Sequence, residues 1–371
     1  MEPVLSQMIE RVRAAAAAGT PLRIRGGGSK DFYGEPMTGD LLETTAHAGI
    51  TSYEPSELVV TVRAGTPLAE LESLLAGQGQ CLPFEPPHFG GGSAAGSAAT
   101  VGGMVAAALA GPARASVGGV RDYVLGLSMI NGRGELLTFG GQVMKNVAGY
   151  DVSRLVTGSH GALGVIVEVS LKVLPKAPAE TTLKFEMTQA QALRSLNEWG
   201  GKPLPLNASC WLEDAGAGTL FVRLRGAVAA VDAACKILGG DRQDNAQVAA
   251  DWLACRDQRL PWFAECGARD LWRLSVPQTT PVLDLPEAPL VEWHGGQRWL
   301  RVAQGEGERL RDIAAHAGGH ATLFRPGAGR EQQATHRFAP LVPPLDRIHR
   351  ELKREFDPAR IFNRGRMYAD L

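Results

Sequence analysis

No two cysteines in this 371-residue chain are spaced as a CxxC pair. The five that are present are odd in number and scattered: Cys81, Cys210, Cys235, Cys255 and Cys266. Zinc, iron-sulfur and redox dithiol sites use closely spaced cysteines, so the sequence supports none of them. We expect free, buried thiols in a reducing compartment.

The chain also lacks an excess of charge of either sign. It has 38 Lys and Arg against 39 Asp and Glu, a formal net charge of -1. Proteins that bind nucleic acid or anionic lipid through their overall field carry a strong positive balance. We therefore expect no nucleic-acid partner.

No basic and apolar leader opens the sequence, which favours a cytoplasmic protein. An uncharged stretch from Pro86 to Ala113 is long enough to suggest a membrane span. It contains seven glycines and three prolines, however, and few strongly apolar side chains. We predict loops packed around a ligand, and no direct membrane span.

Two common nucleotide-binding motifs are absent as well. The segment RGGGSK at 25–30 has its serine before the lysine, whereas a P-loop requires GxxxxGK followed by Ser or Thr. No GxGxxG lies between a strand and a helix with an acidic residue further on. The sequence therefore supports neither a P-loop nor a Rossmann dinucleotide site.

Three glycine-rich segments are present instead: RGGGSK, ATVGGMVAAALAGP at 99–112 and TGSHGALGVI at 157–166. Glycines let main-chain N–H groups close on an oxyanion, and a helix N-terminus adds a positive dipole end. RGGGSK alone is equally consistent with a plain tight turn. Taken together, the three segments predict a site for a long ligand with a pyrophosphate.

Periodicity predicts the first elements. We expect an amphipathic helix over 2–18 ended by Gly19, and a strand at 22–25. A strand at 58–63 should lead into a helix with Thr66 at N-cap and Pro67 at the first position. The buried stripe of that helix would be Leu68, Leu71, Leu74 and Leu75. A turn at 131–134 joins two strands in a predicted hairpin.

The predicted fold class is α+β. Pro175 and Pro178 interrupt an apolar strand and mark the first boundary, so the expected domains are 1–178, 179–335 and 336–371. In the second, alternating strand and helix patterns indicate an antiparallel sheet with helices on one face. In the third, Leu345, Ile348, Leu352 and Phe356 have helical spacing, and the charges around them are expected to form a solvated face.

Six segments together resemble a known family. They are RGGGSK, PPHFGGG, TVGGMVAAALAGP, GGVRDYVLGLSMINGRGELLTFGG, VMKNVAGYDVSRLVTGSHGALGVIVEVSLKVLP and the closing FDPARIFNRGRMY. The chain resembles the FAD-binding E subunits of bacterial glycolate oxidases (glycolate dehydrogenases), within the flavoproteins that have a vanillyl-alcohol-oxidase type, or PCMH-type, FAD-binding domain. The likeness is close over 20–178 and 318–371 and thin between. It implies a two-subdomain PCMH-type FAD-binding domain followed by a cap of antiparallel sheet and helices.

The resemblance also implies roles for residues. The first loop would hold the FAD pyrophosphate with Gly26, Gly27, Gly28, Ser29 and Lys30. Further contacts to FAD are implied for Pro86 and Pro87 beside the flavin, Gly102 and Gly103 at the diphosphate and ribityl chain, and Gly161, Gly164 and Val165 through the main chain. Asn363, which Arg364 follows in place of the family's proline, would reach the flavin ring. No histidine lies in the first loop or near Gly102, so we expect noncovalent FAD with His88 and His160 as polar wall residues.

The segment 143–166 would then form a wall of the FAD site. Asp151 and Arg154 within it could equally form a structural ion pair. Lys145 and Arg325 are candidates to bind a substrate carboxylate, on position and charge alone. Related catalytic dehydrogenases carry a C-terminal HxGDGNxH-like motif that this chain lacks, so no metal site is expected; its later histidines stand singly: His294, His316, His320, His336 and His349.

The resemblance implies an FAD-binding subunit of a complex that oxidises glycolate, or a similar 2-hydroxy acid, to glyoxylate. A larger FAD subunit and an iron-sulfur subunit would take the electrons onward, and could hold the chain at the inner membrane. Two alternatives stay open. One is a stand-alone FAD-dependent 2-hydroxy-acid dehydrogenase, and the other is a non-catalytic assembly subunit with a degenerate flavin site.

Overall fold

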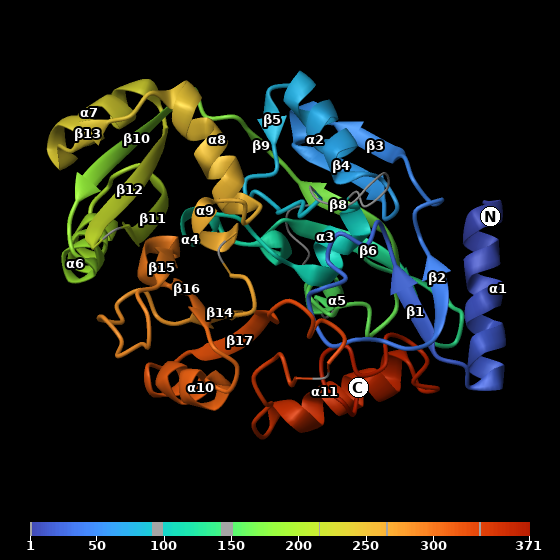
Figure 1. The fold of residues 1–371 in the computed structure, drawn as a ribbon. Helices are drawn as coiled ribbons and strands as arrows, with labels where there is room; N and C mark the ends of the chain where they lie inside the picture. Colours follow the sequence, from blue (N-terminus) through green and yellow to red (C-terminus); the bar gives the residue numbers. More distant parts are fainter. Residues whose placement is uncertain (1, 91–98, 142–150, 215, 265, 334) are drawn as a thin grey trace.

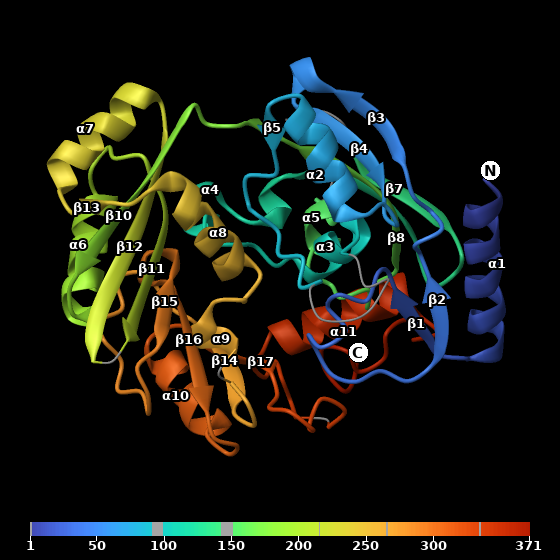
Figure 2. The ribbon, with the colours of Figure 1, turned by 45° about the horizontal axis from the view of Figure 1, so that its top comes forward.

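The computed structural model describes residues 2–90, 99–141, 151–214, 216–264, 266–333 and 335–371. The chain forms two parts that lie side by side (Figures 1 and 2). The first, the N-terminal part, runs from α1 to β9 and is joined by the C-terminal segment. The second, the cap, runs from β10 to β17. Within the described residues, no helix is both long and apolar enough to cross a membrane.

The N-terminal part is built on a five-stranded antiparallel sheet in the order β3-β4-β8-β6-β7. The strands are β3 (Ile50–Glu54), β4 (Val59–Arg63), β6 (Val124–Ile130), β7 (Leu136–Gly140) and β8 (Val165–Lys172). Helices α2 (Leu68–Gly77) and α3 (Val101–Ala107) share the apolar core of this sheet. The predicted hairpin is confirmed, since β6 pairs with β7 and the amide of Asn131 donates to the carbonyl of Glu135 at 3.0 Å.

A second, smaller layer carries the first glycine segment. Strand β1 (Leu22–Arg25) pairs in parallel with β2 (Asp40–Glu43) beside helix α1 (Pro3–Ala18). Gly19 ends α1 in the left-handed conformation at φ 66°, as the sequence predicted. One face of α1, including Met8 and Val12, shares an apolar core with Leu22 of β1 and with Val165 and Val167 of β8.

Two details of α2 differ from the prediction. The helix begins one residue later, with Pro67 as the cap, because the hydroxyl of Thr66 is used elsewhere: it accepts from the amide of Gly49 at 2.9 Å. The predicted stripe was also wrong for Leu74, which is 37% exposed while Leu68, Leu71 and Leu75 are fully buried. Leu74 lies to the side of the i, i+3, i+7 face that meets the sheet.

The cap is an eight-stranded sheet in the order β13-β10-β12-β11-β15-β16-β14-β17, antiparallel at every pairing. The strands are β10 (Ala179–Glu186), β11 (Leu206–Asp214), β12 (Ala217–Gly226), β13 (Asp241–Arg242), β14 (Asp270–Ser275), β15 (Leu290–Glu292), β16 (Gln297–Val302) and β17 (His320–Arg325). The helices are α6 (Gln189–Gly200), α7 (Val228–Leu238), α8 (Asn245–Arg256), α9 (Pro261–Ala264) and α10 (Gly307–His316).

The prediction that helices cover one face of this sheet was wrong. Along β11, Trp211 packs in one core with α6 and α7, whereas Cys210 packs in another with α8 and α9. Successive residues of a strand point to opposite faces, so the two helix pairs lie on opposite sides. We call the side with α6, α7 and α10 the outer face, and the side with α8 and α9 the inner face. The inner face also shares its core with Tyr33 and Leu109 of the N-terminal part.

Other short elements are α4 (Arg114–Val117), α5 (Val152–Val156), β5 (Gln80–Cys81) and β9 (Leu174–Pro175), with three-residue 3-10 helices η1 (Pro55–Glu57), η2 (Val120–Asp122) and η3 (Trp293–Gly295). After β17 the chain forms α11 (Leu345–Phe356), as its periodicity predicted, and returns to the N-terminal part. The amide of Leu22 donates to the carbonyl of Ile361 at 2.7 Å, and the amide of Gly132 to that of Phe356 at 2.8 Å. We therefore propose the division 1–178, 179–335 and 336–371, with the last segment completing the first domain.

Candidate functional site

The three glycine-rich segments lie together around α3. A methyl group placed on Gly26 would come within 2.4 Å of the hydroxyl of Thr100, so the first loop touches the start of the second segment. The third segment follows the other end of α3, where the amide of Gly158 donates to the carbonyl of Val105 at 3.0 Å and that of His160 to Ala106 at 2.9 Å. The geometry brings together three stretches that are far apart in sequence.

The first loop offers free main-chain donors. Within the described residues, the amides from Gly27 to Lys30 donate to no protein acceptor. Gly28 has φ 76°, which a residue with a side chain rarely adopts, and a methyl group there would meet the guanidinium of Arg25 at 2.2 Å. Successive free amides of this kind form a concave anion site. The loop therefore fits a phosphate group.

Lys30 lies on the cap side of this loop. Its ammonium is 3.4 Å from the hydroxyl of Ser29 and 5.7 Å from the ring centre of Phe89. Burial lowers the pKa of Lys30 to about 8, although the carboxylate of Asp257 in the cap raises it. The side chain therefore stands between the first loop and the cap.

The second segment begins with a capped helix. Thr100 is the N-cap of α3, and its hydroxyl accepts from the amide of Gly103 at 3.2 Å. Gly102 and Gly103 were predicted to precede the helix but lie in its first turn, because Thr100 takes the cap position. A methyl group on Gly102 would lie 2.7 Å from the Cβ of Ala64, whereas one on Gly103 would meet only Thr100, at 3.1 Å. Gly102 thus permits close packing, and Gly103 leaves room on the other side.

Asn363 joins strand β1 to the third glycine-rich segment. Its side-chain oxygen accepts from the amide of Ile24 at 2.8 Å, and its side-chain nitrogen donates to the carbonyl of His160 at 2.6 Å. A methyl group on Gly161 would lie 2.6 Å from that nitrogen. The side-chain amide thus fastens β1, just before the first loop, to the third segment. Its reach to the flavin ring stays a prediction.

Gly164 and Val165 have packing roles. A methyl group on Gly164 would lie 2.2 Å from the terminal carbon of Met129 and 2.6 Å from the carbonyl oxygen of Ile130. Val165 is fully buried in the core beneath α1. Nearby, the hydroxyl of Ser159 is buried and has no partner within the described residues. That orphaned hydroxyl belongs to the third glycine-rich segment and is a candidate to bond a ligand.

The two candidate wall histidines differ. His88 holds α2 to the cap, since its ring nitrogen lies 2.8 Å from a carboxylate oxygen of Glu72 and its amide donates to Asp257 at 2.9 Å. His160 packs between the rings of Tyr33 and Phe338, with centroids 5.1 and 5.3 Å away. Burial, with smaller contributions from Arg366 and Arg273, lowers the pKa of His160 to about 3. His160 is therefore a neutral wall residue.

The candidates for a substrate carboxylate fare differently. Lys145 lies outside the described residues. Arg325 donates to the side-chain oxygen of Gln258 at 3.0 Å, and its guanidinium lies 4.7 Å from the ring centre of Phe32.

Asp151 and Arg154 form an ion pair at 3.2 Å, and Asp151 also caps α5, which confirms the structural interpretation of that pair.

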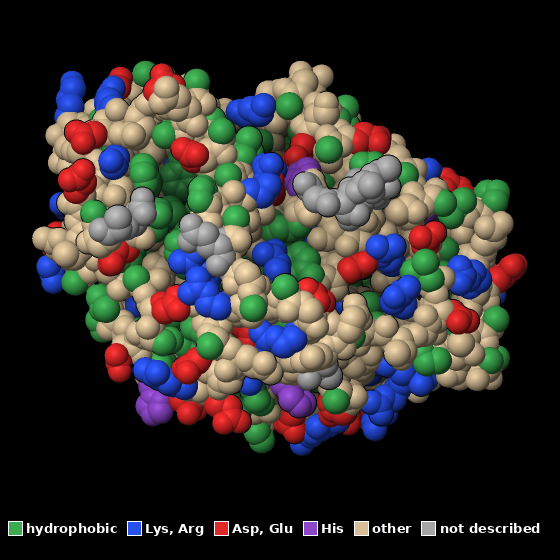
Figure 3. All heavy atoms as spheres, in the orientation of Figure 1, with side chains coloured by type: hydrophobic (Ala, Val, Ile, Leu, Met, Phe, Trp, Pro, Cys, Tyr) green, Lys and Arg blue, Asp and Glu red, His purple; other side chains and the backbone are tan. Residues whose placement is uncertain are grey.

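Pro86 and Pro87 are buried where the N-terminal part meets the cap. Pro87 lines a small cavity together with Phe89, Arg273, Glu292 and Gln297. The last three come from the inner face of the cap sheet and were not predicted. In the sequence they are only polar residues at alternate positions of strands. A sheet face exposed to solvent has the same pattern, so the sequence did not mark them as site residues. Lys and Arg side chains also appear across the middle of the face in Figure 3, near where the two parts meet.

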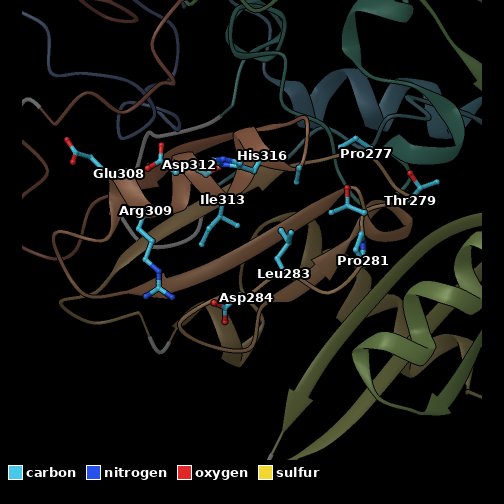
Figure 4. Close-up of a pocket in the computed structure, with 12 residues that line it drawn as sticks. Pro277, Thr279, Pro281, Leu283, Asp284, Glu308, Arg309, Asp312, Ile313 and His316 are labelled. Atoms are coloured by element: carbon cyan, nitrogen blue, oxygen red, sulfur yellow. The ribbon is translucent and has the colours of Figure 1, made fainter.

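A cavity of about 1010 Å³ lies elsewhere in the described part of the chain. Figure 4 shows its walls, which come from α10 and from the connection between β14 and β15. Helix α10 packs on the outer face of the cap sheet, opposite the side that carries Arg273. This groove therefore takes no part in the site between the two parts.

Among the residues that the structure describes, no group of three or more His, Cys, Asp or Glu could hold a metal ion.

Comparison with known sequences agrees with this geometry. A family model described as "FAD binding domain" matches residues 5–140. The Escherichia coli glycolate oxidase subunit GlcE is 46% identical over 365 residues, which cover 98% of this chain and 97% of that protein. Glycolate oxidase subunit GlcD of Bacillus subtilis is 30% identical over 165 residues, 44% of this chain and 34% of the relative. A D-lactate dehydrogenase of Archaeoglobus fulgidus is 30% identical over 188 residues, 50% of this chain and 41% of the relative.

Among solved structures, alkyldihydroxyacetonephosphate synthase superposes with a TM-score of 0.65 at 16% identity. The match covers 96% of this chain and 75% of that protein. At this identity the likeness concerns the fold alone. It confirms the predicted α+β fold, and the family match adds that the N-terminal part is an FAD-binding domain.

Proposed function

Because the chain belongs to the family of glycolate oxidase GlcE subunits, we propose that it is the FAD-binding subunit of a complex that oxidises glycolate to glyoxylate. The observation that carries the proposal is the 46% identity to GlcE along 98% of the chain. The family match over 5–140 makes the chain a flavoprotein oxidoreductase that acts on CH–OH groups.

The geometry of the three segments fits FAD. We assign the diphosphate to the free amides of the first loop and to the neighbouring turn of α3 around Gly103. The orphaned hydroxyl of Ser159 and the main chain near Gly161 would face the rest of the nucleotide. We also propose that FAD is bound noncovalently. In the described part of these segments the histidine is His160, whose ring packs between Tyr33 and Phe338.

Bound FAD supplies the acceptor for the hydride that leaves the carbon of a 2-hydroxy acid. The residues of this chain bind and orient the cofactor and exclude water from it. His160, neutral at all ordinary pH values, supplies an uncharged wall next to Tyr33. The aromatic cluster of Phe32, Phe89 and Phe324 would shield the cofactor site from water on the side nearest the cap.

We further propose that the electrons pass to a larger FAD subunit and an iron-sulfur subunit. The names GlcE and GlcD of the relatives indicate a complex of several subunits, and the chain has no cysteine spacing suited to a cluster of its own. Attachment to the inner membrane, where it occurs, would then come through those partners.

The test is to express this chain alone and with its partner subunits, and to measure bound flavin and glycolate-dependent dye reduction in each case. We expect one FAD per chain alone and full activity in the complex. A colourless chain that still restores activity would instead favour the assembly-subunit alternative. Full glycolate oxidation by the isolated chain would favour a stand-alone dehydrogenase.

The first loop provides a sharper prediction. Replacement of Gly27 by Asp should remove bound flavin, because it adds a carboxylate next to amides that would otherwise meet a diphosphate. Flavin absorbance per chain after gel filtration is the measurement. Gly201→Asp, at the exposed end of α6, is the control and should keep its flavin. A Gly27→Asp protein with normal flavin content would exclude the first loop from the site.

A further inference from the structure

The groove of about 1010 Å³ on the outer face of the cap has no role in the cofactor site. One wall is α10, on which Glu308, Asp312 and His316 are spaced four apart and so share the face that lines the groove. The other wall is the connection between β14 and β15. Figure 4 shows the side chains of Ile313 and Leu283 in the space between the two walls. The groove therefore combines an apolar centre with polar edges.

The edges carry negative charge that the described part of the chain does not neutralise. Asp284, Glu308 and Asp312 are exposed, and none of the three forms an ion pair among the described residues. Arg309 also lines the groove, but its guanidinium lies 3.7 Å from a carboxylate oxygen of Glu306. The groove therefore attracts cationic groups, and it repels nucleic acid and anionic lipid.

Two of these carboxylates lie on α10 at a cost to the helix. Glu308 and Asp312 are one turn apart, and like charges at that spacing repel each other. The helix dipole compensates for Glu308, which is in the first turn, but not for Asp312 in the next turn. A cation supplied by another molecule would relieve this repulsion.

The wall opposite α10 is fixed from beneath by a buried arginine. The fully buried side chain of Arg298 donates to the carbonyls of Thr280 at 2.6 Å and Pro281 at 2.8 Å, and both of these residues line the groove. No carboxylate pairs with Arg298 among the described residues. Burial lowers the pKa of Arg298 only to about 10, so the side chain is charged at pH 7.

This arginine makes the groove suitable for binding. Hydrogen bonds from a charged donor are stronger than those from a neutral one, so the main chain at Thr280 and Pro281 is held in place before any partner arrives. A surface that is already ordered loses less conformational entropy when it binds.

We propose that this groove is the docking site for a basic segment of a partner subunit in the glycolate-oxidising complex. Lysine or arginine side chains of that segment would meet Asp284, Glu308 and Asp312. An apolar side chain between them would cover Ile313 and Leu283. The volume is at the upper end of the roughly 300–1,000 Å³ of small-molecule sites, and the groove opens to solvent, which suits a length of polypeptide. The inference rests on the proposed function and names where a partner binds.

The position of the groove leaves the cofactor site free. Helix α10 packs on the outer face of the cap sheet through Leu310 and Ala314, whereas the N-terminal part meets the inner face through Tyr33 and Leu109. A segment bound in the groove would hold the partner without filling the space between the two parts.

Binding of the holoprotein to the other subunits of the complex, purified together, tests the site by biolayer interferometry. Glu308→Lys combined with Asp312→Lys should weaken binding by about 10-fold or more at low salt, because two attractions become repulsions. The loss should shrink in about 1 M salt, where charges are screened beyond about 3 Å. Ile313→Ser should weaken binding about 5-fold at both salt concentrations, because it removes an apolar contact and no charge.

The matched control is Glu10→Lys combined with Glu70→Lys, which changes the net charge equally at exposed positions on α1 and α2. It should bind the other subunits like wild type. Bound FAD per chain should be normal in every variant, which shows that each is folded. If the double variant of α10 does not fold, Asp312→Asn, which removes one charge at nearly the same size, should still weaken binding about threefold.

Wild-type affinity in the double variant of α10 would overturn the inference, as would a loss no larger than that of the control. A chain that dimerises alone through Glu308 and Asp312, yet binds the other subunits normally when both are replaced, would assign the groove to a second copy and would also overturn it. These results leave the proposed function intact. Absence of FAD and of glycolate oxidation in the wild-type complex would instead overturn the proposed function.

Discussion

At the scale of single residues, glycines in this chain serve two different purposes. Gly27 and Gly28 belong to a loop whose amides are free, whereas Gly164 is a contact between strands. Sequence alone shows a glycine in a glycine-rich segment at both places. Only the neighbours distinguish a glycine that admits a ligand from one that admits a neighbouring strand.

Replacement of Gly164 by Ala should therefore lower stability by about 1–3 kcal/mol, since the added methyl meets Met129 and the main chain of Ile130. Urea unfolding followed by circular dichroism is the measurement. The flavin affinity of the fraction that remains folded should stay normal.

The matched control is Gly200→Ala at the end of α6, where nothing lies within 4 Å of the added methyl. Its stability should stay equal or rise slightly. A normal midpoint for Gly164→Ala, combined with weaker FAD binding, would show that this glycine belongs to the ligand site after all.

At the scale of elements, α11 is attached in an unusual way. Of the four apolar residues at helical spacing, Leu352 and Phe356 pack against the core of the N-terminal sheet. Leu345 and Ile348, in contrast, are 47% and 43% exposed. The buried side chain is Lys353, whose ammonium donates to the carbonyls of Ala162 and Phe362 at 2.8 Å. The same ammonium lies 2.8 Å from a carboxylate oxygen of Asp357, which is fully buried. A lysine thus fastens the helix to the third glycine segment.

Lys353→Met should destabilise the protein by about 3–5 kcal/mol, because Asp357 would remain as a buried charge without its cation. Thermal unfolding with flavin fluorescence as the probe should show the site opening with the main transition. Lys236→Met is the control, because the Lys236 side chain is exposed on α7, and it should leave the midpoint of thermal unfolding unchanged. Stability of Lys353→Met equal to that of the control would mean that the ion pair contributes little.

The helices and strands of this chain were largely predictable, because periodicity reports which residues share a face. What that face packs against depends on tertiary contacts, so the exposure of Ile348 and the burial of Lys353 were not predictable. The same limit applies to the site. Glycine-rich loops are visible in sequence, whereas Arg273 and Gln297 come to line one cavity only through strand register.

At the scale of the whole molecule, one carboxylate connects the two parts. Glu85 of the N-terminal part accepts two hydrogen bonds at 2.7 Å from Arg223 in the cap and one at 3.1 Å from Arg225. Its side chain is only 16% exposed. Burial would raise the pKa of Glu85, but the two arginines outweigh it and hold the pKa below the ordinary value of 4.5.

The sign of the pH effect follows. Because the pKa of Glu85 is lower in the folded state, the unfolded state binds more protons near pH 4.5, and stability is lost as pH falls from there through the folded pKa. Glu85→Gln should lower stability at pH 7 by roughly 3 kcal/mol and flatten its decline below pH 4.5.

Urea unfolding between pH 3 and pH 7 measures both effects in one series, with ~0.5-unit steps around the ordinary glutamate pKa. Glu198→Gln, exposed on α6, is the control and should follow the wild-type curve. An acid-induced decline in Glu85→Gln as steep as that of wild type would place the responsible carboxylate elsewhere.

The pairing of β1 with the C-terminal tail has a consequence for biogenesis. Ile24 and Asn363, which share a hydrogen bond, are 339 positions apart, and Phe362 lies alongside Leu22. A ribosome therefore delivers the start of this neighbourhood long before its end, and the early strand must wait, unsupported, until the tail has been made. Acquisition of the cofactor belongs to the finished polypeptide rather than to the growing one.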